Sequence, residues 1–178
     1  MPLPQGSIDT RARQLRLLLF DVDGVLTDGS VCINADGSEQ KQFFIRDGAA
    51  MVWAQQAGLL VGLLSGRASD ATTRRAAELS IPIVLQGQSD KRIAYGQLLD
   101  EHGLRDDQVA YMGDDLMDLP VLTRAGLSAA PADAPYDVRN RVHWVSRYDG
   151  GRGAAREMIE MVLKATDRWN ALTESFLV

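Results

Sequence analysis

The chain has 178 residues, of which 46% are hydrophobic and 24% are charged, and its net charge at pH 7 is -5. These values predict a single globular domain with a packed core, and the acidic balance argues against nucleic acid or an anionic membrane as a partner. Cys32 is the only cysteine, so an intrachain disulfide is excluded, and we expect a cytoplasmic protein without a transmembrane helix.

The chain begins with a polar segment that leads into a short apolar run. We expect residues 1–12 to be flexible, residues 13–170 to form the domain, and residues 171–178 to be a C-terminal tail. The apolar run over residues 15–20 is typical of a buried strand in a parallel sheet, because such strands are covered on both faces.

Two β-prone runs follow this strand, at residues 30–34 and 40–45. The Asp-Gly pair between them is a strong signal for a tight turn that joins two antiparallel strands. The sequence therefore predicts a small β-hairpin over residues 30–45, inserted between the first strand and the next helix. We expect Cys32, within this hairpin, to be a small core residue.

From residue 47 onward, predicted helices alternate with short apolar runs. This alternation predicts an α/β fold, a Rossmann-like parallel sheet with helices on both faces and the small β-hairpin inserted after the first strand. Asp47 is expected to cap the N-terminus of the first of these helices. The predicted helices span residues 47–57, 69–79, 89–101, 116–124 and 153–169, and the predicted strands span residues 59–64, 83–85, 109–112, 126–130 and 142–145.

Acidic residues follow the first predicted strand. Asp21 and Asp23 are two positions apart, so on an extended chain their side chains point to the same side. The carboxyl ends of parallel strands form one edge of a sheet, where ligands bind, and two neighbouring carboxylates favour a cation such as Mg²⁺. An ordinary Asp-Gly turn at the end of a strand is the alternative explanation of the same residues.

Polar groups also follow the later strands of the predicted sheet. Ser65 and Gly66 come after the second core strand and Asp114 comes after the fourth, while Lys91 lies at the start of a helix. Taken singly, these residues have ordinary explanations as a polar turn, a helix cap and an exposed lysine. Taken together at one edge of the sheet, they predict a single site.

In this order the residues resemble the four motifs of the haloacid dehalogenase superfamily of phosphohydrolases. The stretch DVDGVLTDG, from Asp21 to Gly29, resembles the 3-deoxy-D-manno-octulosonate 8-phosphate phosphatase family in particular, and the likeness extends from about residue 17 to residue 157. The resemblance implies a Mg²⁺-dependent phosphatase that acts on this sugar phosphate through an aspartyl-phosphate intermediate. It also implies a capless homotetramer in which the hairpin and the tail lend residues to a neighbouring subunit's site.

The resemblance further implies a role for individual residues. Asp21 is expected to be the nucleophile and the Asp23 side chain the general acid and base, with an oxygen of Asp21 and the backbone carbonyl of Asp23 as metal ligands. The remaining expected roles are metal ligand for Asp114, phosphate binding for Ser65, Gly66 and Lys91, a neutralising catalytic charge for Lys91, and support of the metal or of Lys91 for Asp115. Asp118 is expected to lie behind the residues that contact the metal and the substrate.

Arginines are expected to bind the acidic sugar, because their guanidinium groups suit bidentate carboxylate recognition. The residues that the resemblance assigns to the sugar are Asp23, Arg46, Asp47, Gly48, Arg67 and Arg75. Phe44, Ala50 and Val52 depart from the family pattern, which leaves open a phosphatase for another acidic sugar, such as a nonulosonate 9-phosphate. A non-catalytic oligomerisation module of the same fold is the other alternative. A phosphate-transferring mutase is disfavoured because so small a hairpin cannot exclude water.

Overall fold

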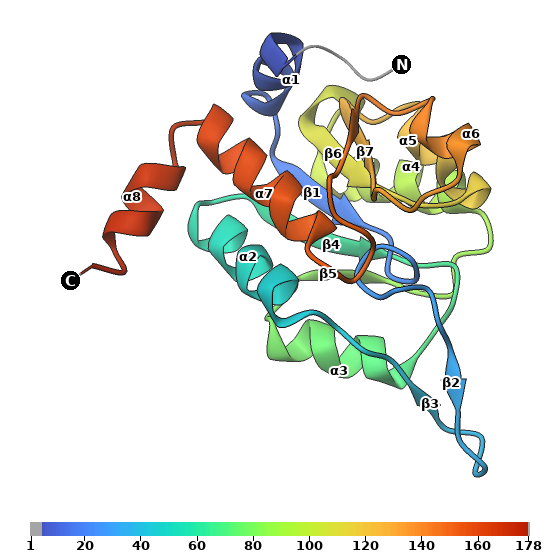
Figure 1. Ribbon diagram of the computed structural model, residues 1–178. Coiled ribbons are helices and arrows are strands. Elements are labelled where there is room, and N and C mark those ends of the chain that lie inside the picture. Colours follow the sequence, from blue (N-terminus) through green and yellow to red (C-terminus); the bar gives the residue numbers. More distant parts are fainter. Residues whose placement is uncertain (1–4, 178) are drawn as a thin grey trace.

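A parallel sheet of six strands forms the centre of the molecule (Figure 1). The structure, a computed structural model, describes residues 5–177. The strands are β1 (Leu17–Phe20), β4 (Leu60–Leu64), β5 (Ile83–Leu85), β6 (Val109–Met112), β7 (Leu127–Ala130) and β8 (Trp144–Val145). They lie in the order β5-β4-β1-β6-β7-β8, and every neighbouring pair is parallel, which confirms the predicted sheet.

The central strand, β1, is apolar throughout because both faces of the sheet are covered. It pairs with β4 on one side and with β6 on the other, so that Phe20 lies opposite Leu63 and Met112. Leu18 and Phe20 belong to one hydrophobic cluster, and the other two leucines of the strand belong to a second cluster on the opposite face. The residue that follows β1 therefore emerges between the ends of two neighbouring strands.

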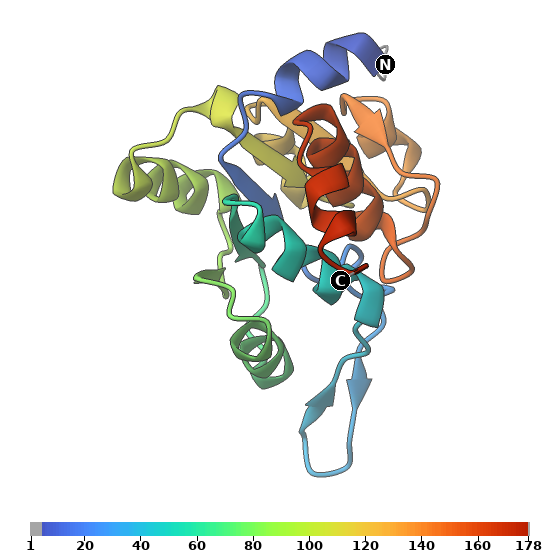
Figure 2. The ribbon, with the colours of Figure 1, turned by 90° about the vertical axis from the view of Figure 1, so that its left-hand side faces the viewer.

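Helices cover both faces of the sheet, as predicted (Figures 1 and 2). The first face carries α1 (Gln5–Ala12), α2 (Ile45–Gln56), α3 (Asp70–Glu78) and α7 (Ala154–Ala165), and the second carries α4 (Lys91–His102), α5 (Leu119–Leu122) and α6 (Tyr136–Arg139). Two short 3-10 helices (Asp106–Gln108 and Leu116–Asp118) and α8 (Trp169–Glu174) are the remaining helices of the described chain. No described helix is long and apolar enough to cross a membrane.

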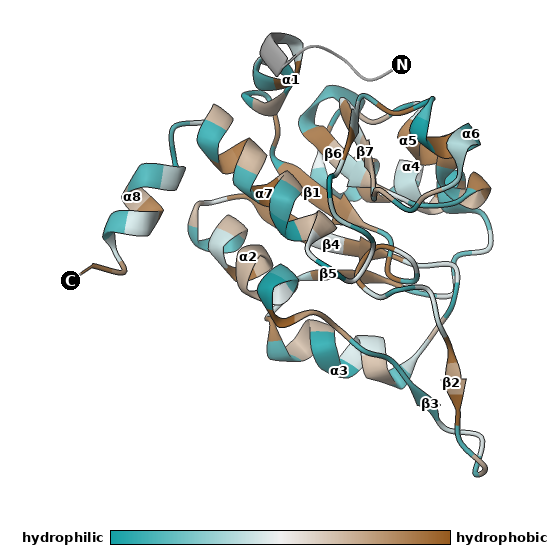
Figure 3. Cartoon of the chain, viewed as in Figure 1, coloured by the Kyte–Doolittle hydropathy of each residue, from teal (hydrophilic) through white to brown (hydrophobic). Residues whose placement is uncertain are grey.

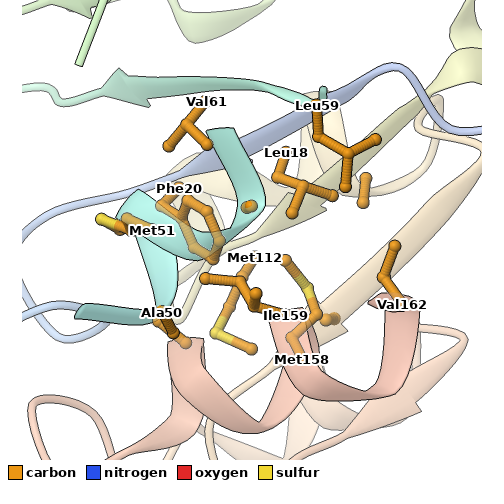
Figure 4. Close-up of a cluster of buried hydrophobic side chains, with 14 of the residues drawn as sticks. Leu18, Phe20, Ala50, Met51, Leu59, Val61, Met112, Met158, Ile159 and Val162 are labelled. Carbon is orange, nitrogen blue, oxygen red and sulfur yellow. The ribbon is translucent and has the colours of Figure 1, made fainter. Parts of the chain in front are cut away.

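The larger hydrophobic cluster lies between the sheet and helices α2 and α7. Hydrophobic colour concentrates on the strands in Figure 3. Figure 4 shows Phe20 and Met112 of the sheet gathered with Met51 of α2 and Ile159 of α7. Each of these four side chains is at most 1% exposed. Close packing of this kind holds the strands in fixed positions, and it therefore fixes the loops at their ends.

A two-stranded antiparallel hairpin projects from the domain, as predicted (Figure 2). Its strands are β2 (Cys32–Ile33) and β3 (Glu39–Gln40). The expectation that Cys32 is a core residue is wrong, because its side chain is exposed. A hairpin outside the main sheet has no second layer to bury its side chains.

Residues 5–12 differ from the expected flexible segment, because they form α1. Ile8 and Ala12 are one helical turn apart, are fully buried, and belong to the same hydrophobic cluster as α7. The residues between them are polar, so two apolar residues four positions apart are too few to indicate a helix from the sequence. Residues 1–4 of the expected N-terminal segment and residue 178 of the expected tail lie outside the described residues, and the domain boundaries stay a prediction.

Helix α2 begins two residues earlier than predicted. Its first residue is Ile45 and its N-cap is Phe44, whose side chain makes no capping hydrogen bond. The prediction that Asp47 caps this helix is therefore wrong. Asp47 lies in the first turn of α2, and its carboxylate accepts a hydrogen bond from the backbone of α7 instead.

Two other predicted helices are divided in the structure. The helix predicted over residues 116–124 is a 3-10 turn followed by α5, since Pro120 near the start of α5 has no N–H with which to continue the preceding turn. The final predicted helix ends at Ala165, and α8 follows after a short connection. Asp167 in this connection has a φ of 60°, which is outside the range of a right-handed helix.

We expect the buried face of α7 to supply a large part of the stability. Ile159→Ala should lower the free energy of unfolding by about 2–5 kcal/mol, because it removes buried methyl groups and leaves a cavity. Chemical denaturation followed by circular dichroism measures this. Lys164→Ala, on the exposed side of the same helix, is the matched control and should change the free energy by less than about 0.5 kcal/mol. Equal losses for the two variants would contradict the packing described.

Candidate active site

Three neighbouring strands deliver polar residues to one edge of the sheet. Asp21 follows β1, Ser65 follows β4 and Asp114 follows Gly113 at the end of β6. The Asp21 backbone N–H donates to the Met112 carbonyl at 2.9 Å, so the chain stays in register past the end of the strand. Asp21 is only 7% exposed and Ser65 only 1%. The structure thus brings together residues that are far apart in the sequence.

Lys91 joins this group from the first turn of α4. The Asp90 side chain caps that helix by accepting hydrogen bonds from two backbone N–H groups of its first turn. The Lys91 Nζ lies 2.9 Å from Asp21 Oδ2 and 2.6 Å from Asp118 Oδ1, and its side chain is 3% exposed. Burial alone disfavours the ammonium charge, but the two carboxylates outweigh burial and raise the pKa of Lys91. Lys91 is therefore a buried cation between two acids.

Asp118 is fully buried and uses both of its carboxylate oxygens. Its Oδ1 accepts hydrogen bonds from Lys91 and, at 2.6 Å, from the Tyr111 hydroxyl. Its Oδ2 accepts from the backbone N–H groups of Asp114 at 2.9 Å and Asp115 at 3.1 Å. Asp118 therefore positions Lys91 and the loop after β6 at the same time.

Asp115 contributes through its backbone and not through its side chain. Its carboxylate is exposed and accepts from the Leu116 N–H at 2.7 Å, capping the 3-10 turn that follows. The resemblance implied that Asp115 supports Lys91 or the metal, but the side chain that contacts Lys91 is that of Asp118. The sequence did not indicate that Tyr111 belongs to the site, since a tyrosine inside an apolar strand is normally a residue of the hydrophobic core.

The carboxylates of Asp21, Asp114 and Asp118 form a cluster that fits a metal ion. One oxygen from each lies within 4.8 Å of the others. Burial, followed by repulsion from Asp118, raises the pKa of Asp21 to about 7. Burial, followed by repulsion from Asp21, raises the pKa of Asp114 to about 8. Asp114 Oδ1 is buried without a hydrogen-bond partner among the described residues, and an acceptor of this kind suits a hard divalent cation.

Glycines allow the loop after β1 to approach its neighbours closely. Gly24 has a φ of 84°, and a Cβ added there would lie 2.1 Å from Asp114 Oδ2. A Cβ added at Gly150, in the glycine-rich turn before α7, would lie 1.9 Å from the Gly24 carbonyl oxygen. The Gly151 N–H donates to the Val25 carbonyl at 2.9 Å. The turn before α7 therefore supports the loop that carries Asp23.

The hairpin contributes two charged residues that the sequence did not reveal. Lys41 Nζ lies 2.5 Å from Asp23 Oδ1 and 3.5 Å from Glu39 Oε1. Arg67, from the loop after β4, lies 2.5 Å from Glu39 Oε2 through Nη2 and 3.8 Å from Asp23 Oδ2 through Nε. Glu39 and Lys41 are two positions apart on an extended arm, so their side chains point to the same side of the chain. This spacing was the feature of the sequence that could have indicated a shared contact.

The loop after β4 lies beside the acidic cluster. The Ser65 N–H donates to the Leu85 carbonyl at 2.8 Å, and its hydroxyl accepts from the Arg67 N–H at 3.3 Å. Gly66 is half-buried, and only Met117 and Gln88 come within 4 Å of a Cβ added there. The loop therefore combines a hydroxyl with a glycine backbone at the end of β4, which is the chemistry expected of a phosphate-binding turn.

Several residues expected to bind the sugar lie instead at contacts between helices. Asp47 is buried and its Oδ1 accepts from the Arg156 N–H at 2.8 Å, which caps α7, and burial raises its pKa to about 6. The Arg75 guanidinium packs on Gly48, where an added Cβ would lie 2.3 Å from Nη2. In the described chain, no hydrogen bond or ion pair joins these three residues to the carboxylate cluster.

Arg46 is exposed and lines a cavity of about 240 Å³ at the N-terminus of α7. The other residues that line it are Phe44, Arg147, Tyr148, Arg152, Gly153, Arg156, Glu157 and Glu160. None of the clustered carboxylates lines this cavity. Of the five residues assigned to the sugar besides Asp23, Arg67 is the one that forms ion pairs with carboxylates of the site among the described residues.

Comparison with known proteins identifies the family. A family model for haloacid dehalogenase-like hydrolases matches residues 78–158. Over 163 residues, the chain is 42% identical to the 3-deoxy-D-manno-octulosonate 8-phosphate phosphatase of Yersinia pestis, and the match covers 92% of this chain and 87% of the relative. The chain belongs to the 3-deoxy-D-manno-octulosonate 8-phosphate phosphatase family. It is a phosphoric monoester hydrolase, as the resemblance implied.

Solved structures of this phosphatase family share the fold. A probable YrbI family phosphatase from Pseudomonas syringae pv. phaseolica 1448A has a TM-score of 0.95 and 41% identity, with 97% of this chain and 98% of that chain covered. A 3-deoxy-D-manno-octulosonate 8-phosphate phosphatase from Moraxella catarrhalis has a TM-score of 0.94 and 34% identity, with 96% and 98% covered. The Moraxella structure is a complex with a magnesium ion, a phosphate ion and a KDO molecule.

We expect the metal-free phosphatase to lose stability as the pH rises. Asp21 and Asp114 have pKa values of about 7 and about 8 in the folded chain, above their ordinary value of 3.8, so the folded state binds protons more tightly than the unfolded state. Their contribution is complete below about pH 4, where both states are protonated, and it is lost as the pH rises to the pKa values of the folded chain. In EDTA, the melting temperature should therefore fall between about pH 4 and about pH 8 and level off above that range.

Two comparisons test this pH dependence. Asp114→Asn should flatten the fall in melting temperature, because it removes one of the two titrating carboxyls, and added Mg²⁺ should stabilise the wild-type protein most at high pH. A melting temperature that rises with pH in EDTA would contradict the proposed repulsion.

Proposed function

We propose that this phosphatase hydrolyses 3-deoxy-D-manno-octulosonate 8-phosphate to the free sugar acid and inorganic phosphate, with Mg²⁺ as its cofactor. The observation that carries the proposal is the buried contact of Asp21 with Lys91, 2.9 Å long, beside two further carboxylates. The sugar is supported by the 42% identity to the Yersinia enzyme. Magnesium is supported by the ion in the Moraxella complex.

Asp21 is proposed as the nucleophile, and Asp23 as the general acid and base. Attack of an Asp21 oxygen on phosphorus forms an aspartyl-phosphate, and splitting the hydrolysis in this way replaces one very slow step by two easier ones. Asp23 protonates the leaving sugar oxygen and then accepts a proton from the water that hydrolyses the intermediate. Lys91 offsets the negative charge of Asp21 and of the phosphoryl group.

The charges of the site leave room for a divalent cation. The contacts of the described site join five carboxylates to three cations, which leaves two negative charges without a cation. The carboxylates are Asp21, Asp23, Glu39, Asp114 and Asp118, and the cations are Lys41, Arg67 and Lys91. Asp21, the Asp23 backbone carbonyl and Asp114 are the proposed ligands, because Asp118 already uses both oxygens. When bound, Mg²⁺ offsets the charge between the nucleophile and the phosphate.

The remaining assignments concern the substrate and the assembly. Ser65, Gly66 and Lys91 are proposed to hold the phosphoryl oxygens, and Arg67 the sugar carboxylate, because Arg67 is exposed beside Asp23. Sugar-binding roles for Arg46, Asp47, Gly48 and Arg75 remain part of the proposal. We also propose that the protein is a homotetramer, in which the projecting hairpin and the tail of one subunit reach the site of a neighbouring subunit. Exposure of Ile33 on the hairpin, at 71%, supports such a contact.

Asp21→Asn should abolish turnover, with a loss of more than about 10⁴-fold in kcat, because an amide cannot act as the nucleophile. Phosphate release from the sugar phosphate in Mg²⁺ measures this. Asp137→Asn, which changes an exposed aspartate of α6 that pairs with Arg141, is the matched control and should keep wild-type kcat. Near-normal activity of Asp21→Asn would remove the nucleophile assignment.

A panel of phosphorylated sugars tests the substrate. We expect kcat/KM to be highest for 3-deoxy-D-manno-octulosonate 8-phosphate, with turnover lost in EDTA and restored by Mg²⁺. A preference for a nonulosonate 9-phosphate would keep the mechanism and assign the difference to Phe44, which lines the cavity beside Arg46. No phosphate release from any member of the panel, by folded protein, would favour the non-catalytic module.

A further inference from the structure

The side chain of Lys41 is buried although Lys41 directly follows β3 of the projecting hairpin. The hairpin projects from the domain (Figure 2), yet the side chain of Lys41 is 0% exposed. A buried lysine is costly unless a carboxylate compensates its charge. The compensating group is Asp23, whose Oδ1 lies 2.5 Å from the Lys41 Nζ.

The two oxygens of Asp23 differ in their surroundings. Oδ1 accepts the hydrogen bond from Lys41. Oδ2 has no hydrogen-bond partner among the described residues, and the Nε of Arg67 stands 3.8 Å away, beyond hydrogen-bond distance. Lys41 therefore fixes the position of Oδ1, and Oδ2 is a buried acceptor whose hydrogen-bonding capacity is not used by the described residues.

A second ion pair holds the arm from which Lys41 extends. Glu39 Oε2 lies 2.5 Å from Arg67 Nη2, and Glu39 Oε1 lies 3.5 Å from Lys41 Nζ. In this pair the Glu39 side chain is 19% exposed and the Arg67 side chain is 53% exposed, so the contact lies at the surface. The hairpin is thus tied to the strand-end loops through Glu39 and to the acid–base residue through Lys41.

Each aspartate of the DxD pair therefore has a lysine of its own. Asp21 is held by Lys91 from α4, and Asp23 by Lys41 from the hairpin. The two lysines approach from different elements, so the two carboxyls can be oriented independently. A nucleophile and a proton carrier need different orientations, because one faces phosphorus and the other faces the leaving oxygen.

We propose that Lys41 is a positioning residue that fixes the Asp23 carboxyl for proton transfer, which makes the hairpin part of the acid–base machinery of its own subunit. The proposal rests on the proposed function, in which Asp23 is the general acid and base. As the Asp21–phosphorus bond forms and the phosphorus–sugar oxygen bond breaks, the proton on Asp23 Oδ2 passes to the sugar oxygen. When water attacks phosphorus and the Asp21–phosphorus bond breaks, a water proton returns to Oδ2. Lys41 keeps its protons throughout.

Leaving groups that differ in their need for a proton test the proposal. 4-Nitrophenolate leaves without protonation, whereas a sugar oxygen does not. Lys41→Met should lower kcat on the sugar phosphate by on the order of 10²-fold while KM changes by less than about threefold. Its first turnover of 4-nitrophenyl phosphate, followed by rapid mixing, should stay within about threefold of wild type.

Four comparison proteins complete the experiment. Asp23→Asn should show the same dependence on the leaving group, and adding Lys41→Met to it should cause no further loss of kcat. Lys41→Arg should recover part of the kcat, because a cationic donor remains beside Asp23. Lys164→Met, on the exposed side of α7, should behave as wild type. Melting temperatures of all variants check that each is folded.

The outcomes separate this inference from the proposed function. If Asp23→Asn depends on the leaving group and Lys41→Met does not, the positioning role of Lys41 is overturned while the role of Asp23 stands. Equal losses on both substrates for Lys41→Met, or an additive loss in the double variant, also overturn it. If Asp23→Asn itself treats both leaving groups alike, the acid–base assignment fails and the inference fails with it.

Discussion

The buried contact of Lys91 with Asp21 and Asp118 is the interaction on which the rest of the site depends. It joins the end of β1, the start of α4 and the turn after β6, with Nζ–oxygen distances of 2.9 and 2.6 Å. Removing one partner of such a group leaves an uncompensated buried charge, which typically costs about 3–5 kcal/mol. The same charges thus hold three elements in place and contact Asp21, the proposed nucleophile, so a change at Lys91 affects both the stability of the fold and the proposed reaction.

Local patterns explain what the sequence could predict. The apolar run ending at Phe20 predicts a buried strand, and the acids that follow it lie at the carboxyl edge of the sheet because of the parallel topology. Asp21, Ser65, Lys91 and Asp114 are each recognisable from their neighbours in the chain. The structure brings these four together because β1, β4 and β6 are adjacent in the sheet and because α4 carries Lys91 to the same edge.

Contacts between distant residues explain what the sequence could not predict. Asp118 was named without its partners, because nothing local shows that Lys91, 27 positions earlier, reaches it. Asp47 reads as the cap of its own helix, yet it accepts a hydrogen bond from Arg156, 109 positions later. Lys41 and Glu39 look like solvated hairpin charges until the fold places Asp23 and Arg67 beside them. Residue type and spacing define each group, but only packing decides which groups meet.

The glycine turn before α7 has a consequence for how the enzyme is made. Gly150 and Gly151 lie against the loop that carries Asp23, and Asp47 completes the cap of the helix that follows them. On the ribosome, the loop that carries Asp23 is synthesised well before Gly150 and Gly151. A nascent chain therefore holds this loop without its glycine support until the start of α7 has emerged.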